Sequence, residues 1–158
     1  MQGAEVMSYT AFISYNTLPE EQVFIYRLQT LAAASDITVL LPQRNGQRIT
    51  NETRLRIDRS NCVIVFLTSQ LTPDTSEELS YAEAKQKLII PIYEKDVIPP
   101  STPPSWISYD PRSETPGAVE LKVLNLLKDK KKTEENKQAL LLVGLGLGLL
   151  ALILSNKS

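Results

Sequence analysis

The spacing of apolar residues changes several times along this chain, and each change marks a predicted element. Short runs rich in Val, Ile, Leu and Phe recur, and longer stretches that mix polar and apolar residues at helical spacing lie between them. The short runs predict strands at 9–14, 37–41, 62–68 and 88–93, with a weaker strand at 106–109. The longer stretches predict helices at 19–35, 50–59, 75–87 and 118–127.

This alternation predicts an α/β fold. The run 62–68 is apolar on both faces, which is typical of a parallel strand covered by helices on each side. We therefore expect a flavodoxin-like five-stranded parallel sheet of order 2-1-3-4-5 flanked by helices. Ligands in such sheets bind beyond the carboxyl ends of the strands, where the strand order reverses. Here that point lies between the first and third strands, which end in Ser14-Tyr15-Asn16 and Thr68-Ser69.

A different pattern fills the C-terminal part of the chain. The segment 139–154 contains sixteen residues without a polar side chain. At about 1.5 Å per residue it would span about 24 Å, which is short for a bilayer core. Gln138 and Ser155 can extend the helix, so we expect one transmembrane helix over 138–155. The alternative is a buried core helix, although a helix that is apolar on every face has no side for water.

The charges around this segment predict its orientation. Five lysines precede it and one follows it, at Lys128, Lys130, Lys131, Lys132, Lys137 and Lys157. Because positive residues stay on the cytoplasmic side, we expect a cytosolic domain at 1–127, a charged linker at 128–137 and a single-pass C-terminal tail anchor at 138–155. Gly144 and Gly148 form a GxxxG pair that would allow two such helices to self-associate, although chance can produce this pair in a Gly/Leu-rich segment.

Composition removes several classes of chemistry. The 158 residues include 17 Lys and Arg, 18 Asp and Glu, one Cys and no His. His-based triads, His-ligated metals and internal disulfides are therefore excluded, and a net charge of −1 argues against a nucleic-acid partner. Residues 1–127 contain only Gly3, Gly46 and Gly117, so phosphate-binding GxGxxG and P-loop motifs are absent. We expect no metal and no bound cofactor.

The helix after the third strand carries the candidate chemistry. Its start, Thr75-Ser76-Glu77-Glu78-Leu79, places two carboxylates at the rim of the expected crevice. A carboxylate there can stabilise a cationic transition state, such as the oxocarbenium ion of glycosidic cleavage. Alternatively, Thr75 and Glu78 form a capping box, and the acids favour the helix dipole.

Other residues near this edge also have two interpretations. The Tyr15 ring can stack on a base while Ser14 and Asn16 bind ribose or phosphate, or Asn16 can cap the next helix. Arg44, in the loop 42–46, can bind a phosphate or a partner carboxylate, or can be solvated. Tyr81 can border the site or pack in the core. Cys62 opens a buried strand and is expected to be a core thiol.

Several of these segments resemble one known family. Residues 11–15, AFISY, look like the first strand of bacterial Toll/interleukin-1 receptor (TIR) domains. Residues 62–69, then Glu78-Leu79-Ser80-Tyr81-Ala82, then 89–92 are similar to that family's third strand, acidic helix and fourth strand, in the same order. The resemblance covers about residues 8–127.

The resemblance implies the same flavodoxin-like fold and one of two activities. The first is a membrane-anchored NAD+ glycohydrolase or cyclase, which cleaves the nicotinamide–ribose bond to give ADP-ribose or a cyclic ADP-ribose signal in bacterial anti-phage defence. NAD+ would then be substrate, and not a cofactor. The second is a non-enzymatic scaffold or signalling adapter that assembles through TIR–TIR contacts. A nucleoside deoxyribosyltransferase-like enzyme is a third interpretation, but no second matching acid is found.

The resemblance also implies roles for single residues. The family's catalytic glutamate falls on Glu78, with Glu77 as the fallback. The substrate-binding positions fall on Ser14, Tyr15, Asn16, Ser69 and Tyr81. The loop that contacts a neighbouring protomer contains Pro42, Arg44 and Gly46. One departure is that Thr72-Pro73-Asp74 stands where the family often has a Trp-Cys pair.

Overall fold

A computed structural model of the chain describes residues 8–16, 19–46, 48–67, 72–94, 107–110 and 112–155; for 19–21, 116 and 140–155 it describes the helical backbone but not the side chains. Its centre is a five-stranded parallel sheet of order β2-β1-β3-β4-β5, so the predicted strand order is confirmed. The strands are β1 (Tyr9–Ser14), β2 (Ile37–Leu40), β3 (Cys62–Leu67), β4 (Leu88–Glu94) and β5 (Ile107–Tyr109).

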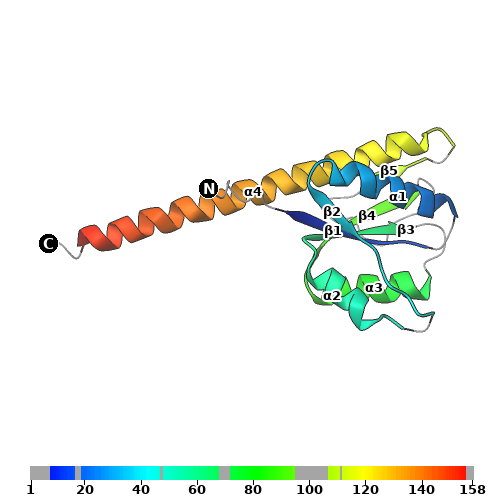
Figure 1. The fold of residues 1–158 in the computed structure, drawn as a ribbon, viewed down its shortest axis with the longest axis horizontal. Helices are drawn as coiled ribbons and strands as arrows, with labels where there is room; N and C mark the ends of the chain where they lie inside the picture. The colour runs from blue at the N-terminus through cyan, green and yellow to red at the C-terminus, as the bar shows by residue number, and fades with distance from the viewer. Residues whose placement is uncertain are drawn as a thin grey trace.

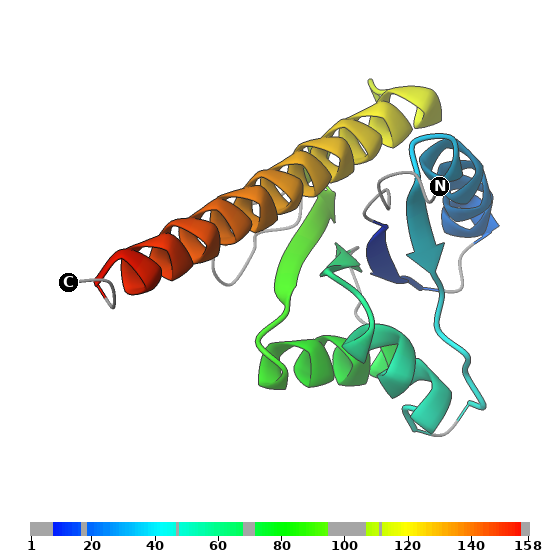
Figure 2. The ribbon, with the colours of Figure 1, turned by 60° about the vertical axis from the view of Figure 1, so that its left-hand side comes forward.

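Helices cover both faces of this sheet. Helices α1 (Pro19–Ala33) and α4 (Pro116–Ser155) lie on one face, and α2 (Asn51–Asp58) and α3 (Pro73–Ala84) lie on the other (Figures 1 and 2). Successive residues of a strand point to opposite faces. Ala11 and Ile13 of β1 therefore join the core under α1 and α4, whereas Phe12 joins the core under α2 and α3. Burial on both sides explains why β3 has no polar face.

Helix α3 begins two residues earlier than the sequence pattern predicts. Its N-cap is Thr72, whose Oγ1 accepts a hydrogen bond from the Thr75 backbone N–H at 3.3 Å. Pro73 is the first helical residue, where its missing N–H is not needed. The expected capping box of Thr75 and Glu78 therefore does not form, and the Glu78 side chain lies a full turn inside the helix.

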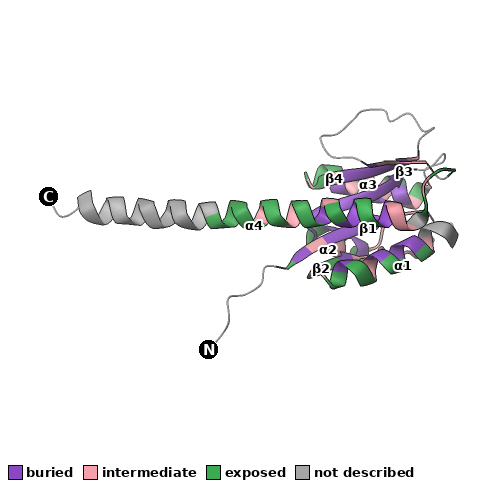
Figure 3. Ribbon diagram, turned by 90° about the horizontal axis from the view of Figure 1, so that it is seen from above, coloured by how far each residue is buried: buried purple, intermediate pink, exposed green. Residues whose placement is uncertain are grey.

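Helix α4 is a single helix of 40 residues. Its first turns pack on the sheet through Val119, Val123 and Leu127, and Lys131 Nζ donates to the Ser35 carbonyl of the α1–β2 turn at 3.0 Å. The helix then continues through the charged segment and beyond the sheet, where the described side chains are mostly exposed (Figure 3).

For the apolar end of α4 the structure describes the backbone but not the side chains. The helical backbone is described to Ser155, but the side chains of 140–155, which include most of the expected membrane segment 138–155 and the Gly144 and Gly148 pair, are not. Among the residues that the structure does describe, no helix is long and apolar enough to span a bilayer.

One charged contact ties α4 to α1. Arg27 Nε lies 3.2 Å from Oε1 of Glu120. The Glu120 side chain is 2% exposed, whereas that of Arg27 is 56% exposed. Glu120 Oε1 makes no hydrogen bond of good geometry within the described residues, so the contact is a charge pair. A buried carboxylate of this kind depends on its partner.

Candidate functional site

A buried carboxylate sits at the carboxyl end of β1, beside the point where the strand order reverses. Glu78 is 1% exposed, and one of its oxygens, Oε1, accepts a hydrogen bond of 2.6 Å from the hydroxyl of Ser14, the last residue of β1. Helical spacing explains the placement, because Thr75, Glu78 and Ala82 share the face of α3 that packs on the sheet. The site is thus built where parallel sheets place ligands.

The same carboxylate holds an arginine from the loop after β2. Arg44 Nε lies 3.1 Å from Glu78 Oε2, and Arg44 Nη2 lies 2.9 Å from Glu78 Oε1. This is the two-pronged geometry in which arginine binds carboxylates most strongly. The Arg44 guanidinium carbon also lies 5.1 Å from the centre of the Tyr15 ring, which gives a cation–π contact. Arg44 is therefore bound to a carboxylate of its own chain rather than solvated, and its side chain is 15% exposed.

Thr75 connects this cluster to the residues that follow β1. Its side chain is fully buried, and its hydroxyl lies 3.3 Å from the Tyr15 carbonyl and 3.3 Å from Oδ1 of Asn16. Asn16 is itself 4% exposed. Three of the positions expected to bind substrate, Ser14, Tyr15 and Asn16, therefore lie around Glu78.

The neighbouring carboxylate has a different environment. Glu77 Oε2 accepts a hydrogen bond of 2.7 Å from the backbone N–H of Ile49, near the end of the same loop. The start of the loop is also held, because the Gln43 N–H donates to Thr53 Oγ1 of α2 at 3.0 Å. Between these points Gly46 has a φ of +80°, a conformation that glycine adopts without strain. The adjacent residues Glu78 and Glu77 of α3 therefore hold this loop at two points, Glu78 at Arg44 and Glu77 at Ile49.

Tyr81 belongs to a second cluster. Its hydroxyl donates to Asp58 at the end of α2 at 2.9 Å, and its ring lies beneath Arg54 and Lys85. Burial and then the Asp58 hydrogen bond raise the pKa of Tyr81. These contacts place Tyr81 in the groove between α2 and α3. Ser69, the remaining expected substrate-binding residue, lies outside the described residues.

Sequence reasoning missed Thr75 as a site residue and did not join Arg44 to Glu78. The signal for Thr75 was present, because Thr72-Pro73 is a strong helix start that turns Thr75 toward the sheet. The Arg44 contact joins residues 34 positions apart through an irregular loop, and local patterns contain no information on such a contact.

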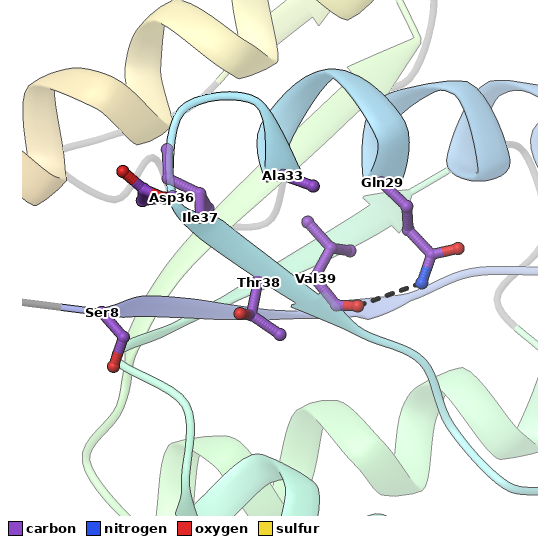
Figure 4. A pocket seen from close by; sticks show the side chains of 7 residues that line it. All are labelled: Ser8, Gln29, Ala33, Asp36, Ile37, Thr38 and Val39. Carbon is purple, nitrogen blue, oxygen red and sulfur yellow. Dashed lines mark hydrogen bonds between the residues drawn. The ribbon is translucent and has the colours of Figure 1, made fainter.

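Three hollows lie elsewhere on the described surface, and two of them are close to residues discussed above. One, of about 430 Å³, lies between α1 and β2, where Gln29 Nε2 donates to the Val39 carbonyl at 3.0 Å (Figure 4). Asp36 is the single ionisable residue among those that line it. The other, of about 470 Å³, lies between α2 and α3 beside Arg48 and Tyr81. Across the described parts of the chain, no group of three or more His, Cys, Asp or Glu is placed to hold a metal ion.

Solved structures share this fold at low sequence identity. The CMP N-glycosidase BcmB of Clostridium botulinum is 17% identical over 72% of this chain and 97% of its own, with a TM-score of 0.52. The sugar isomerase domain of an RpiR transcription factor from Sphaerobacter thermophilus is 14% identical over 84% of this chain and 74% of its own, with a TM-score of 0.52. The TIR domains of the Roq1 resistosome are 19% identical over 81% of this chain and 78% of their own, with a TM-score of 0.47.

Comparison at the level of sequence families is more specific. A search of curated proteins found no match. The family model of the TIR domain, however, matches residues 11–123, which include the end of β1, the four other strands of the described sheet and the whole Glu78 cluster. Because this match covers most of the chain, the protein belongs to the TIR domain family.

Proposed function

We propose that this TIR domain cleaves the N-glycosidic bond of NAD+ with Glu78 as its catalytic carboxylate. The observation that carries the proposal is the buried Glu78 side chain, held by Ser14 at the carboxyl end of β1. An aromatic ring, that of Tyr15, borders the same cluster through Arg44. An acid beside a ring at the strand-order reversal suits a ligand that has both a flat base and a ribose on which positive charge develops as the bond breaks.

The reaction needs a single carboxylate and no redox step. The bond between C1′ of the ribose and the pyridinium nitrogen breaks, and its electron pair stays on that nitrogen, so neutral nicotinamide leaves. The positive charge that develops on the ribose is stabilised by the Glu78 carboxylate. Water then adds to C1′ and releases a proton, which gives ADP-ribose. If an adenine nitrogen of the same molecule adds instead, the product is a cyclic ADP-ribose.

The neighbours of Glu78 have supporting roles in this proposal. Ser14 fixes one carboxylate oxygen through a hydrogen bond of 2.6 Å, which holds the group in one orientation. Tyr15 offers its ring to the nicotinamide or the ribose. Preorganisation of this kind is effective because the charged group does not have to reorient as the bond breaks.

The direct test is nicotinamide release from NAD+ by the full-length protein. We expect Glu78→Gln to lose release by at least about a hundredfold, because the amide lacks the negative charge. Glu77→Gln tests the fallback residue. Release that continues unchanged in Glu78→Gln and disappears in Glu77→Gln would move the site by one residue. CMP and deoxynucleosides belong in the same assay, because a preference for either would change the substrate and leave the bond type unchanged.

A second candidate function is a TIR–TIR scaffold. Four large apolar side chains are exposed on α1 and α4, namely Val23, Tyr26, Leu31 and Leu121. Apolar side chains of this size on one side suit contact with another protein. Sedimentation of wild type and Tyr26→Ser would test this function. Assembly without NAD+ cleavage would favour the scaffold.

We also propose that the apolar end of α4 attaches the domain to a membrane, as part of a signalling role in anti-phage defence. The segment 139–154 has no polar side chain and follows a lysine-rich stretch. Flotation with liposomes tests attachment, and the expected result is that the full chain floats and a chain ending at Gln138 does not. Phage infection of cells carrying wild type or Glu78→Gln tests the role.

A further inference from the structure

Both oxygens of the Glu78 carboxylate are engaged by side chains of the same chain in this structure. Its Oε1 contacts both the Ser14 hydroxyl and Arg44 Nη2, and its Oε2 contacts Arg44 Nε. With Glu78 only 1% exposed, the Arg44 guanidinium fills the space against the carboxylate. A substrate that needs this carboxylate cannot reach it until Arg44 leaves.

The guanidinium also matches the proposed substrate in chemistry. It is flat and positively charged, it lies against a carboxylate, and it packs on an aromatic ring 5.1 Å away. The nicotinamide ring of NAD+ is likewise flat and cationic, and in the proposed reaction the nicotinamide–ribose part would need the same two partners. One site cannot hold both cations, so the arginine and the substrate compete.

Arg44 is placed where it can leave without disturbing the sheet. It lies in the irregular connection between β2 and α2, and its guanidinium contacts Thr75 and Glu78 of α3. Figure 1 shows this connection running from the sheet to α2. Its side chain is 15% exposed, so rotation about its own bonds leads to solvent. The loop itself stays fastened by Glu77 to Ile49 and by Gln43 to Thr53. Movement of the Arg44 side chain alone would therefore leave both of these loop contacts intact.

We propose that Arg44 is an internal inhibitor, a tethered cation that closes the Glu78 site until substrate or a change in the loop displaces it. This inference rests on the proposed function, because it names the regulation of that same site. The opposite role is an arginine that assists catalysis, which would make the same contacts in this structure. The two roles predict opposite effects when the guanidinium is removed.

The test compares nicotinamide release by wild type, Arg44→Ala and Arg44→Ala/Glu78→Gln. Arg48→Ala, which removes another arginine of the same loop, is the matched control. As an inhibitor, Arg44 lowers the fraction of competent protein, so Arg44→Ala should raise kcat/KM for NAD+ by about tenfold or more. The double variant should release no nicotinamide, and Arg48→Ala should match wild type. Release by folded Arg44→Ala at or below the wild-type level would overturn the proposal.

Added methylguanidinium gives an independent test of whether Arg44 inhibits or assists catalysis. At roughly 10 mM it should enter the vacated space in Arg44→Ala and inhibit release in competition with NAD+, with sodium chloride at equal ionic strength as the control. If methylguanidinium instead increases release by Arg44→Ala, Arg44 assists catalysis and the inhibitor role is wrong. Wild type should respond little, because its site is already filled.

A further measurement tests whether the variant folds. Arg44→Ala leaves a buried carboxylate without its cation, so thermal unfolding is followed in parallel. If Arg44→Ala does not fold, Arg44→Gln, which keeps a donor to Glu78, replaces it, and release at or below the wild-type level again overturns the proposal.

The last measurement applies if no variant cleaves NAD+, in which case the proposed function fails. Carbodiimide labelling of Glu78 then decides the inhibitor role. Greater labelling in the variant supports it, and equal labelling overturns it.

Discussion

At the scale of single residues, the environment of one glutamate defines the site. Glu78 combines deep burial, a serine partner from β1 and an arginine partner from a loop. Its neighbour Glu77 is one position away and contacts a backbone N–H instead. Because adjacent positions on a helix differ by about 100° in direction, two identical side chains reach different parts of the molecule. Residue type alone therefore does not decide which of the two acts.

Substitution of Ser14 tests how the carboxylate is held. Ser14→Ala removes the hydrogen bond to Oε1 and should lower the unfolding free energy by about 1 kcal/mol. It should lower kcat for NAD+ cleavage by roughly tenfold, because the carboxylate is no longer fixed. Ser60→Ala is the control, since this buried serine bonds the Arg56 carbonyl elsewhere. Steady-state kinetics that show equal kcat for both variants would remove Ser14 from the mechanism.

The buried thiol gives a prediction for pH. Burial raises the pKa of Cys62 from its ordinary 9.0 to about 11, and burial also raises the pKa of its neighbour Tyr9. The unfolded chain therefore releases the Cys62 proton first as the pH rises. The contribution of Cys62 to stability should be constant well below pH 9 and fall by about 2 kcal/mol between pH 9 and 11. Urea unfolding between pH 9 and 11 measures the loss of unfolding free energy, which should be smaller in Cys62→Ala than in wild type. An equal loss in the two proteins would contradict the assignment to Cys62.

At the scale of elements, the sequence predicts the sheet better than the helix ends. The strands at 9–14 and 62–68 could be predicted because period and burial are local properties. A strand buried on both faces indicated a parallel sheet, and five strands in this length suggested the flavodoxin-like order. The start of α3 was misplaced because Thr72 and Thr75 are both good capping residues, and Pro73 decides between them. The partner of Arg44 could not be predicted, since the path of an irregular loop depends on contacts far away in sequence.

The packing of α1 against α4 gives a stability prediction. Arg27→Ala leaves the buried Glu120 carboxylate without a compensating charge and should lower the unfolding free energy by about 1 to 2 kcal/mol. The loss is smaller than for a fully buried ion pair because Arg27 is more than half exposed and solvent screens its charge. Adding Glu120→Leu to this variant should recover the loss, because an apolar side chain suits the buried position. Denaturant titration of the single and double variants measures both effects. No recovery in the double variant would contradict this account of the contact.

At the scale of the whole molecule, α4 belongs to two regions. Its first part completes the core through Leu127 and contacts the α1–β2 turn through Lys131, and its later part extends beyond the sheet. The fold should therefore not depend on the end of the helix. A chain ending at Gln138 should keep its thermal midpoint within about 2 °C, because the deleted residues follow several exposed positions. Differential scanning calorimetry measures the thermal midpoint of the full and the shortened chain. A large fall of the midpoint in the shortened chain would mean that the end of α4 packs on the domain.

In the proposed reaction Glu78 carries the cleavage of the N-glycosidic bond of NAD+, and one pair of variants tests this role. Nicotinamide release from NAD+ is measured for Glu78→Gln and for Glu83→Gln, which makes the same change at an exposed position of the same helix. Both are measured in the Arg44→Ala background, so that an occupied site does not hide activity. We expect full nicotinamide release by the Glu83 variant and almost none by the Glu78 variant. Equal release by the two would contradict it.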